Sequence, residues 1–106
     1  MHEVRLTRRA EQEMDDAHQW WAQHRSVEQA DRWYVKFHEA MSALAIAPDR
    51  CSLASENESF PIEVRQLTFG LGARPTHRAL YTVRPDAIVI LRIRHVAQAP
   101  VPPDDD

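Results

Sequence analysis

Hydrophobic residues recur at helical spacing in the first half of the chain. One stripe, with intervals of three and four residues, consists of Ala10, Met14, Ala17 and Trp21. This spacing places the four side chains on one face of an amphipathic helix. Thr7 precedes the stripe at an N-cap position, where its hydroxyl can accept a hydrogen bond from a free backbone N–H. The pattern predicts a helix from Thr7 to about His24.

A second, longer apolar stripe follows almost at once. Its members are Ala30, Trp33, Tyr34, Phe37, Met41 and Leu44. Ser26 stands at the N-cap position with Gln29 three residues later, which is the arrangement of a capping box, and Pro48 ends the helix. Two amphipathic helices joined by a short link form an antiparallel hairpin. We expect both stripes to lie in the core.

The second half of the chain changes to the pattern of β-strands. Residues 62–69, 77–83 and 87–94 are rich in β-branched and aromatic residues, and turn-forming residues separate them. The apolar phase of the first segment slips between Val64 and Leu67, which predicts a β-bulge there. Residues 4–6 also alternate and predict a short edge strand ahead of the first helix.

The order of these elements predicts an α+β fold. The economical arrangement has two layers, with the helical hairpin packed on one face of a small, mainly antiparallel sheet and the N-terminal strand at its edge. A chain of 106 residues is long enough for one hydrophobic core. We assign residues 1–98 to a single domain. Residues 99–106 contain three prolines and three aspartates, which predicts a disordered tail.

Composition restricts the class of protein. No apolar run approaches the roughly 20 residues that span a bilayer. The chain is polar from its second residue, so we expect no signal peptide. The single cysteine, Cys51, has no partner for an internal disulfide. These features predict a cytoplasmic protein.

The formal net charge of −3 conceals an asymmetry along the chain. Residues 1–59 carry 7 basic and 11 acidic side chains, whereas residues 60–99 carry 6 arginines and only 2 acids. Residues 104–106 are all aspartates. This distribution indicates a positive face on the predicted sheet, on which the acidic end of the chain is able to lie. The alternative is that the arginines are scattered over a solvated surface.

Three segments together resemble the RelE/ParE superfamily of toxins. Residues 64–67 (VRQL) resemble the family's V-R-x-L strand, and residues 77–83 (HRALYTV) are similar to its Y-R-x-L-Y-x-V strand. Residues 88–95 (IVILRIRH) resemble its closing strand, which ends in a histidine. The helical hairpin, the chain length and the element order agree as well. The resemblance covers residues 3–98 and implies the toxin of a type II toxin–antitoxin system.

The resemblance implies one of two activities. ParE-like members bind and inhibit DNA gyrase, whereas RelE-like members are metal-independent endoribonucleases that cut mRNA on the ribosome. In a nuclease, Arg65 and Arg78 would hold a phosphate and His95 would be the general acid or base. However, Leu67 stands where RelE-like enzymes tend to have a second basic residue, and no tyrosine or basic residue follows His95.

These departures favour a ParE-like toxin that acts by binding, with the nuclease as the alternative and a non-toxic, partner-binding member of the fold as a third reading. An acidic protein is also poorly suited to the RNA surface of a ribosome. Structural roles remain open for the same residues. Arg65 and Arg78 can pair with Glu63 or with an acid from the helices, and His95 can close the last strand through a hydrogen bond.

The resemblance further implies an antitoxin partner, bound in a toxin–antitoxin hetero-oligomer. Antitoxins are disordered until they bind and then cover exposed toxin surface. We expect an acidic segment on the sheet face opposite the hairpin, where it would meet the arginines Arg65, Arg78, Arg92 and Arg94. Trp20, which points away from the side of Trp21, is a further candidate contact.

Metal and cofactor sites are not predicted. His18 and His24 lie six positions apart on the first helix and do not share a face, so they cannot bind one metal ion together. The two glycines, Gly70 and Gly72, do not form a phosphate-binding loop.

Overall fold

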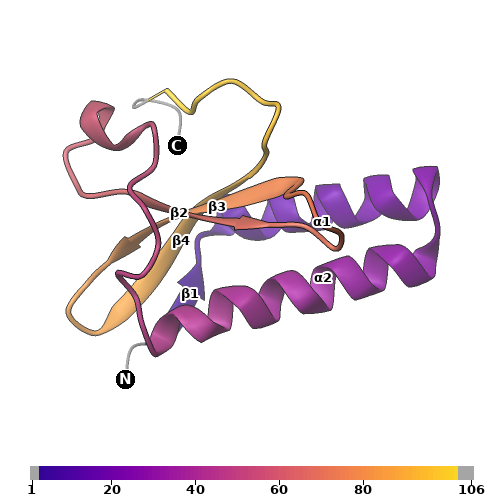
Figure 1. The fold of residues 1–106 in the computed structure, drawn as a ribbon, viewed down its shortest axis with the longest axis horizontal. Helices are drawn as coiled ribbons and strands as arrows, with labels where there is room; N and C mark the ends of the chain where they lie inside the picture. The colour runs from indigo at the N-terminus through magenta and orange to yellow at the C-terminus, as the bar shows by residue number, and fades with distance from the viewer. Residues whose placement is uncertain (1–2, 103–106) are drawn as a thin grey trace.

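In the computed structural model, which describes residues 3–102, four strands form one sheet and two helices cover one of its faces (Figure 1). In chain order the elements are β1 (Glu3–Leu6), α1 (Arg8–His24), α2 (Val27–Ser42), the 3-10 turns Ala43–Ala45 and Asn57–Ser59, β2 (Arg65–Phe69), β3 (His77–Val83) and β4 (Ala87–His95). The predicted α+β architecture is confirmed. No helix in the described part of the chain is long and apolar enough to cross a membrane.

Both helices begin at the predicted caps. The Thr7 hydroxyl accepts a hydrogen bond from the Ala10 N–H at 3.1 Å, and the Ser26 hydroxyl accepts one from the Gln29 N–H at 3.0 Å. The two helices lie antiparallel, and the tip of the hairpin projects beyond the sheet (Figure 1). The end of α1 that carries Trp20 therefore lies away from the strands.

The sheet has the order β1-β4-β3-β2, with β1 parallel to β4 and the other pairs antiparallel. The register shifts between β3 and β4, because Leu80 pairs with Arg92 whereas Tyr81 pairs with Ile90. Leu91 is thus the extra residue of a bulge in β4.

The predicted bulge between Val64 and Leu67 is wrong. β2 begins at Arg65 and pairs with β3 without a shift. The apolar phase slips because Val64 and Leu67 pack against opposite faces of the sheet, each into its own hydrophobic cluster. The side chains of this segment alternate regularly between the two faces of the sheet. Because both faces have apolar positions, the sequence alone resembles a single strand with an irregularity.

Each face of the sheet has its own cover. The face beneath α1 and α2, termed the helix face, carries the main core, which consists of Ala10, Met14, Trp33, Phe37, Met41, Leu44, Leu67, Ala79, Tyr81, Ile88, Ile90 and Ile93. The opposite face, termed the far face, carries a smaller cluster of Ala54, Val64, Leu80 and Val101. Irregular chain, from the segment before β2 and from the segment after β4, covers this second cluster.

Residues 99–102 lie against the far face instead of leaving the body of the protein. Val101 is only 3% exposed, and its N–H donates to a carboxylate oxygen of Glu56 at 2.9 Å. The composition of residues 99–106 resembles that of a linker and predicted a disordered tail, whereas residues 99–102 are held by hydrogen bonds and by the burial of Val101. Residues 103–106 lie outside the described residues.

Candidate partner-binding surface

The far face contains a buried ion pair between Arg78 of β3 and Glu56. The guanidinium donates two hydrogen bonds to the carboxylate, at 2.8 Å and 2.6 Å, and the side chains are 9% and 1% exposed. Burial by itself would raise the pKa of Glu56, but hydrogen bonds from Arg78, the Val101 N–H and Ser55, together with the Arg78 charge, lower this pKa to about 2. Arg78 therefore has a structural role: through Glu56 it holds the irregular segments before β2 and after β4 against the sheet.

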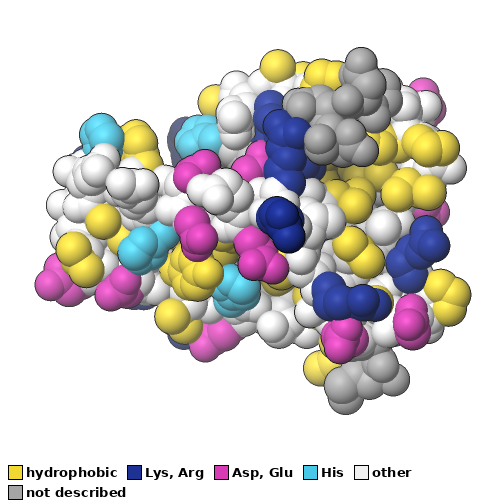
Figure 2. Space-filling model, turned by 180° about the vertical axis from the view of Figure 1, so that it is seen from behind, with side chains coloured by type: hydrophobic (Ala, Val, Ile, Leu, Met, Phe, Trp, Pro, Cys, Tyr) yellow, Lys and Arg dark blue, Asp and Glu magenta, His cyan; other side chains and the backbone are white. Residues whose placement is uncertain are grey.

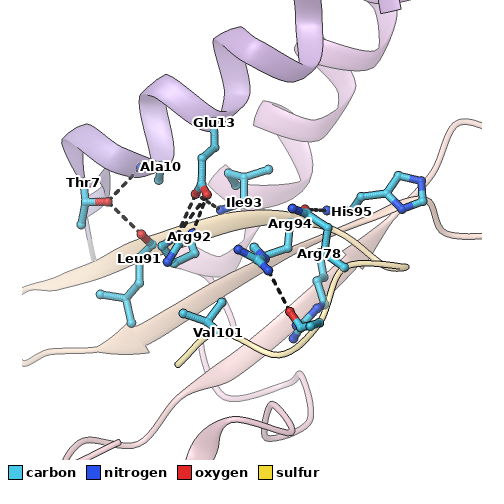
Figure 3. A network of polar contacts seen from close by, with 12 residues as sticks. Thr7, Ala10, Glu13, Arg78, Leu91, Arg92, Ile93, Arg94, His95 and Val101 are labelled. Atoms are coloured by element: carbon cyan, nitrogen blue, oxygen red, sulfur yellow. Dashed lines mark hydrogen bonds and ion pairs between the residues drawn. The ribbon is translucent and has the colours of Figure 1, made fainter. Parts of the chain in front are cut away.

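A second ion pair joins the edge of β4 to α1. Glu13 accepts hydrogen bonds from Arg92 Nε, at 3.1 Å to each carboxylate oxygen, and from the Ile93 backbone N–H at 2.9 Å (Figure 3). β1 pairs with β4 only as far as Ile90, so beyond that point β4 is paired with β3 on one side and has no neighbouring strand on the side of β1. Thr7 donates its hydroxyl to the Leu91 carbonyl at 2.9 Å. Side chains of α1 and its cap thus cover this edge.

Arg65 does not share a face with the other sheet arginines. It has the same alternation as Leu67, which lies in the core of the helix face. Its guanidinium donates to the carbonyl of Cys51 at 2.6 Å and to Glu63 at 3.1 Å. The prediction that Arg65 lies on the face opposite the hairpin is therefore wrong. Its pairing with Glu63 was one of the structural roles that the sequence left open.

Arg94 and His95 lie on opposite faces, as successive residues of an extended strand should. Arg94 is half-buried on the far face beside Arg78, and its terminal nitrogen donates to the Ala99 carbonyl at 2.8 Å. His95 is exposed, and its ring lies 5.2 Å from that of His77 on the other side. Burial lowers the pKa of His77 to about 4, with a smaller contribution from His95.

The three candidate nuclease residues therefore do not converge. Arg65 and His95 belong to the helix-face side but to opposite ends of the sheet, because Arg65 pairs with Tyr81 whereas the neighbours of His95 are His77 and, beyond it, Phe69. Four residues of strand separate the two ends, or about 13 Å at the usual rise. Arg78 lies on the other face. No phosphate-sized centre contacts all three side chains.

A groove of about 370 Å³ opens on the far face, termed the far-face groove. Its apolar lining comes mainly from Phe60, Pro61, Ile62, Val64, Leu80 and Leu91. Val101 forms one wall, and Thr7, Arg9 and Arg92 contribute the polar margin. Figure 2 shows hydrophobic side chains gathered on this half of the molecule with Lys and Arg side chains near them, whereas acidic and histidine side chains dominate the hairpin half.

No local sequence pattern predicts this groove. Phe60, Pro61 and Ile62 stand in a stretch without periodicity, and Val101 stands among prolines, so none of them belongs to an amphipathic pattern. The available signal was the presence of large apolar residues inside polar, aperiodic segments, since such residues usually pack against something.

Trp20 lies apart from the far-face groove. Its side chain is 47% exposed and stacks on His24 with ring centroids 4.5 Å apart. Along α1, Trp20 is 11 residues beyond Arg9, which corresponds to about 16 Å. Trp20 and the sheet arginines therefore do not form one continuous surface.

The outer side of the hairpin carries a shallow cavity lined by Asp15, His18, Asp31, Tyr34 and Val35. His18 and Asp31 are 2.8 Å apart, and burial together with the charges of Asp15 and Glu11 raises the pKa of Tyr34. Within residues 3–102, no three His, Cys, Asp or Glu side chains are grouped as a metal site would require.

The two-layer fold and its sheet define a toxin of the RelE/ParE superfamily. The family model of the ParE toxin of type II toxin–antitoxin systems (parDE) matches residues 4–100 of the sequence. The chain therefore belongs to the ParE toxin family. Among solved structures it is similar to a chain of the chromosomal ParDE toxin–antitoxin system from P. aeruginosa, with a TM-score of 0.74 and 26% identity over 91% of this chain and 97% of that one. No curated protein matches the chain.

Proposed function

We propose that this type II toxin inhibits growth by binding a protein target, with DNA gyrase the first candidate, and that a cognate antitoxin neutralises it through the far-face groove. Inhibition by binding, and not by RNA cleavage, is supported by one observation. The sheet arginines form hydrogen bonds and ion pairs with other groups of the same chain. Arg78 pairs with Glu56, Arg92 with Glu13, and Arg65 with backbone carbonyls and Glu63. In a ribonuclease, arginines of this kind would have to contact the phosphate of the RNA substrate.

A ribonuclease site also needs its groups within reach of one phosphate. The general acid or base must lie within about 3 Å of the proton it moves, directly or through one water. His95 is exposed but is separated from Arg65 by the length of a strand and from Arg78 by the thickness of the sheet. The arrangement supports inhibition by binding.

The experiment for the target combines a reconstituted and a cellular measurement. Purified toxin is added to DNA gyrase in a supercoiling assay, and in cells the rates of DNA and protein synthesis are followed by pulse labelling after induction without antitoxin. Loss of supercoiling and an early stop in DNA synthesis would support the proposal. An early stop in protein synthesis would favour the nuclease, and undisturbed synthesis of both would indicate a non-toxic binding member.

A matched variant separates catalysis from binding. His95→Gln keeps a polar side chain at an exposed position but removes the titratable group. We expect this variant to retain full toxicity in the growth assay. A loss of toxicity of about 100-fold or more, the range of general acid–base catalysis, would contradict inhibition by binding alone.

The antitoxin part of the proposal rests on the shape and chemistry of the far-face groove. Its lining is apolar and Arg9 contributes a positive charge at its margin, so it suits a segment with apolar anchors and an acidic neighbour. Such segments order only on binding, as expected for an antitoxin. The proposal differs from the sequence-based one in that buried Arg78 and Arg92 support the surface instead of contacting the partner.

Three substitutions test this surface. Ile62→Glu places a charge in the groove lining and should weaken binding of the cognate antitoxin at least tenfold in a calorimetric titration. Ile46→Glu introduces the same change at a side chain that is 82% exposed and outside the groove, and Trp20→Ala removes the candidate contact at the hairpin tip. Both should change the affinity less than threefold. Equal losses from all three variants would rule out the groove as the receptor.

A further inference from the structure

The two walls of the far-face groove come from different parts of the sequence. One wall is residues 60–62, before β2, and the other is formed by Val101, after β4. Leu80 of β3 lies on the sheet between them. Neither wall belongs to a helix or a strand, so the hydrogen bonds of regular structure do not fix the width of the groove. Side-chain contacts must do so.

Glu56 joins the two walls. Its carboxylate accepts two hydrogen bonds from Arg78, at 2.8 Å and 2.6 Å, and one from the Val101 N–H at 2.9 Å. Its backbone carbonyl accepts the Ser59 N–H at 2.9 Å, in the 3-10 turn that leads into residues 60–62. Arg78 and Val101 lie on the side of the sheet away from α1 (Figure 3). Glu56 thus holds one wall through its backbone and the other through its carboxylate, and Arg78 attaches both to β3.

The first wall is a short loop that is closed at its base, beside Glu56. The Asn57 side chain accepts the Val64 N–H at 2.8 Å, and the Ala54 N–H donates to the Val64 carbonyl at 2.9 Å. These two hydrogen bonds tie together the ends of the loop that presents residues 60–62. Asn57 follows Glu56 directly, so the position of this loop depends on where Glu56 is held.

The second wall depends on the same carboxylate. Residues 100 and 102 are prolines, which have no N–H, so neither neighbour of Val101 can replace its hydrogen bond to Glu56. The Glu56 side chain is 1% exposed, and hydrogen bonds to a charged acceptor are stronger than those between neutral groups. Arg94 donates to the Ala99 carbonyl at 2.8 Å, which is an exposed contact. The buried contact with Glu56 therefore fixes the distance of this wall from the sheet.

We propose that Glu56 is the positioning residue of the far-face groove and that it sets the affinity for the antitoxin without contacting it. Glu56 and Arg78 lie outside the lining of the groove. The carboxylate holds Val101 and residues 60–62 at a fixed separation, so an apolar anchor of the antitoxin enters a preformed groove and the walls do not first have to be ordered. The identity of the partner rests on the proposed function, whereas the fixed separation of the walls does not.

The affinity for the cognate antitoxin, measured by calorimetric titration, tests the role of Glu56. Glu56→Asp keeps the charge opposite Arg78 but shortens the side chain by one methylene, so the carboxylate cannot reach both Arg78 and the Val101 N–H from the same backbone position. We expect the antitoxin to bind this variant at least tenfold more weakly. Glu58→Asp, the same change at an exposed position in the adjoining turn, is the matched control and should change the affinity less than about twofold. Equal affinities of the two variants would overturn the proposal.

A second variant keeps the test decisive if Glu56→Asp does not fold. Val101→Pro removes the N–H that Glu56 accepts and leaves the ion pair between Glu56 and Arg78 intact. It should weaken antitoxin binding at least tenfold, whereas Val101→Ala, which keeps the N–H, should weaken it less than about fivefold. A larger loss from Val101→Ala than from Val101→Pro would contradict positioning by Glu56.

A double-mutant cycle separates positioning from a general loss of stability. Ile62→Ala removes a lining side chain and should weaken antitoxin binding about tenfold in the wild type. In the Glu56→Asp background the same change should cost less than about threefold, because the displaced wall no longer presents this side chain to the antitoxin. In the control cycle, Ile62→Ala is combined with Ile90→Val, which also lowers stability but lies on the helix face, and the two effects should add. Additive effects in both cycles would overturn the proposal.

Hydrogen exchange of the free protein tests the attachment of the wall without any antitoxin. The Val101 N–H should exchange at least tenfold faster in Glu56→Asp than in the wild type, whereas in Ile90→Val its rate should change less than about threefold. Unchanged exchange in Glu56→Asp would overturn the inference, whatever the antitoxin does. Faster exchange would support it even if Ile62→Glu left antitoxin binding intact, a result that would instead contradict the groove as the antitoxin receptor.

Discussion

The two faces of the sheet are buried by different means. The helix face lies under two regular helices, and its core is almost entirely apolar, with Phe37 stacked on Phe69 at 4.8 Å. The far face lies under irregular chain, and its small apolar cluster surrounds the Glu56–Arg78 ion pair. The same four strands therefore support a core on one side and a polar framework on the other.

The difference follows from the backbone of the two covers. A helix satisfies its own N–H and C=O groups, so it can be laid on a sheet without help from side chains. Irregular chain brings unpaired backbone groups, and each needs a partner when it is buried. Asn57 accepts the Val64 N–H, Glu56 accepts the Val101 N–H, and Arg65 donates to the carbonyl of Cys51. The charged residues that suggest a binding site in the sequence instead form the hydrogen bonds that hold the irregular segments on the sheet.

Equal truncations on the two faces give the largest expected contrast. Ile90→Ala, in the core of the helix face, should lower the free energy of unfolding by about 4 kcal/mol. Leu80→Ala, equally buried on the far face, should cost about 2 kcal/mol, because the irregular cover can settle into the space. Urea denaturation measures both values. Equal costs would mean that the two covers are equally rigid.

Breaking the buried ion pair should have the next largest effect. Glu56→Gln leaves the Arg78 charge buried without a counter-charge and should lower the free energy of unfolding at pH 7 by about 3 kcal/mol. Glu58→Gln, at an exposed position in the 3-10 turn that Glu56 precedes, is the control and should change it by less than about 0.5 kcal/mol. If the two variants were equally stable, the pair would not hold the far-face cover in place.

On the helix face, the corresponding polar feature is the buried His77. Its pKa of about 4 in the folded protein lies below the ordinary value of 6.5, so between these pH values the unfolded chain binds more protons. Stability should thus be complete above pH 6.5 and fall by about 2 kcal/mol on going to pH 5. His77→Phe should flatten this profile and exposed His24→Phe should not. Glu56 contributes only at lower pH, as its carboxylate becomes protonated between pH 4.5 and about 2.

The smallest predicted effect concerns the edge of β4 that Glu13 covers, at Arg92 and Ile93. Glu13→Gln keeps an acceptor for the Ile93 N–H but loses the charge opposite Arg92, and it should cost about 1 kcal/mol. A weaker cap also exposes backbone groups of β4. Sedimentation should then show self-association that Glu11→Gln, an exposed change on the same helix, does not cause. A strictly monomeric Glu13→Gln variant would argue against a protective role for this cap.

Local patterns in the sequence determined the elements and most of their bounds. The caps at Thr7 and Ser26, the two apolar stripes and the alternation in β3 were sufficient to predict the hairpin, the sheet and the family resemblance. These features depend on neighbours within a few residues, so they can be found without knowing the fold. The exposed position of Trp20 followed in the same way from its place beside Trp21 on α1.

The tertiary structure alone decided what the charged residues do. Arg92 and Glu13 are 79 positions apart, and Arg78 and Glu56 are 22 apart, so no local pattern relates them. Whether Arg65 belongs to the helix face or to the far face depends on where β2 begins, because a shift of one residue exchanges the two faces of a strand. The groove, too, is built from aperiodic residues that meet only when the chain folds back over the sheet. Sequence periodicity records which face an element buries, whereas the partners of buried polar groups are fixed by long-range packing.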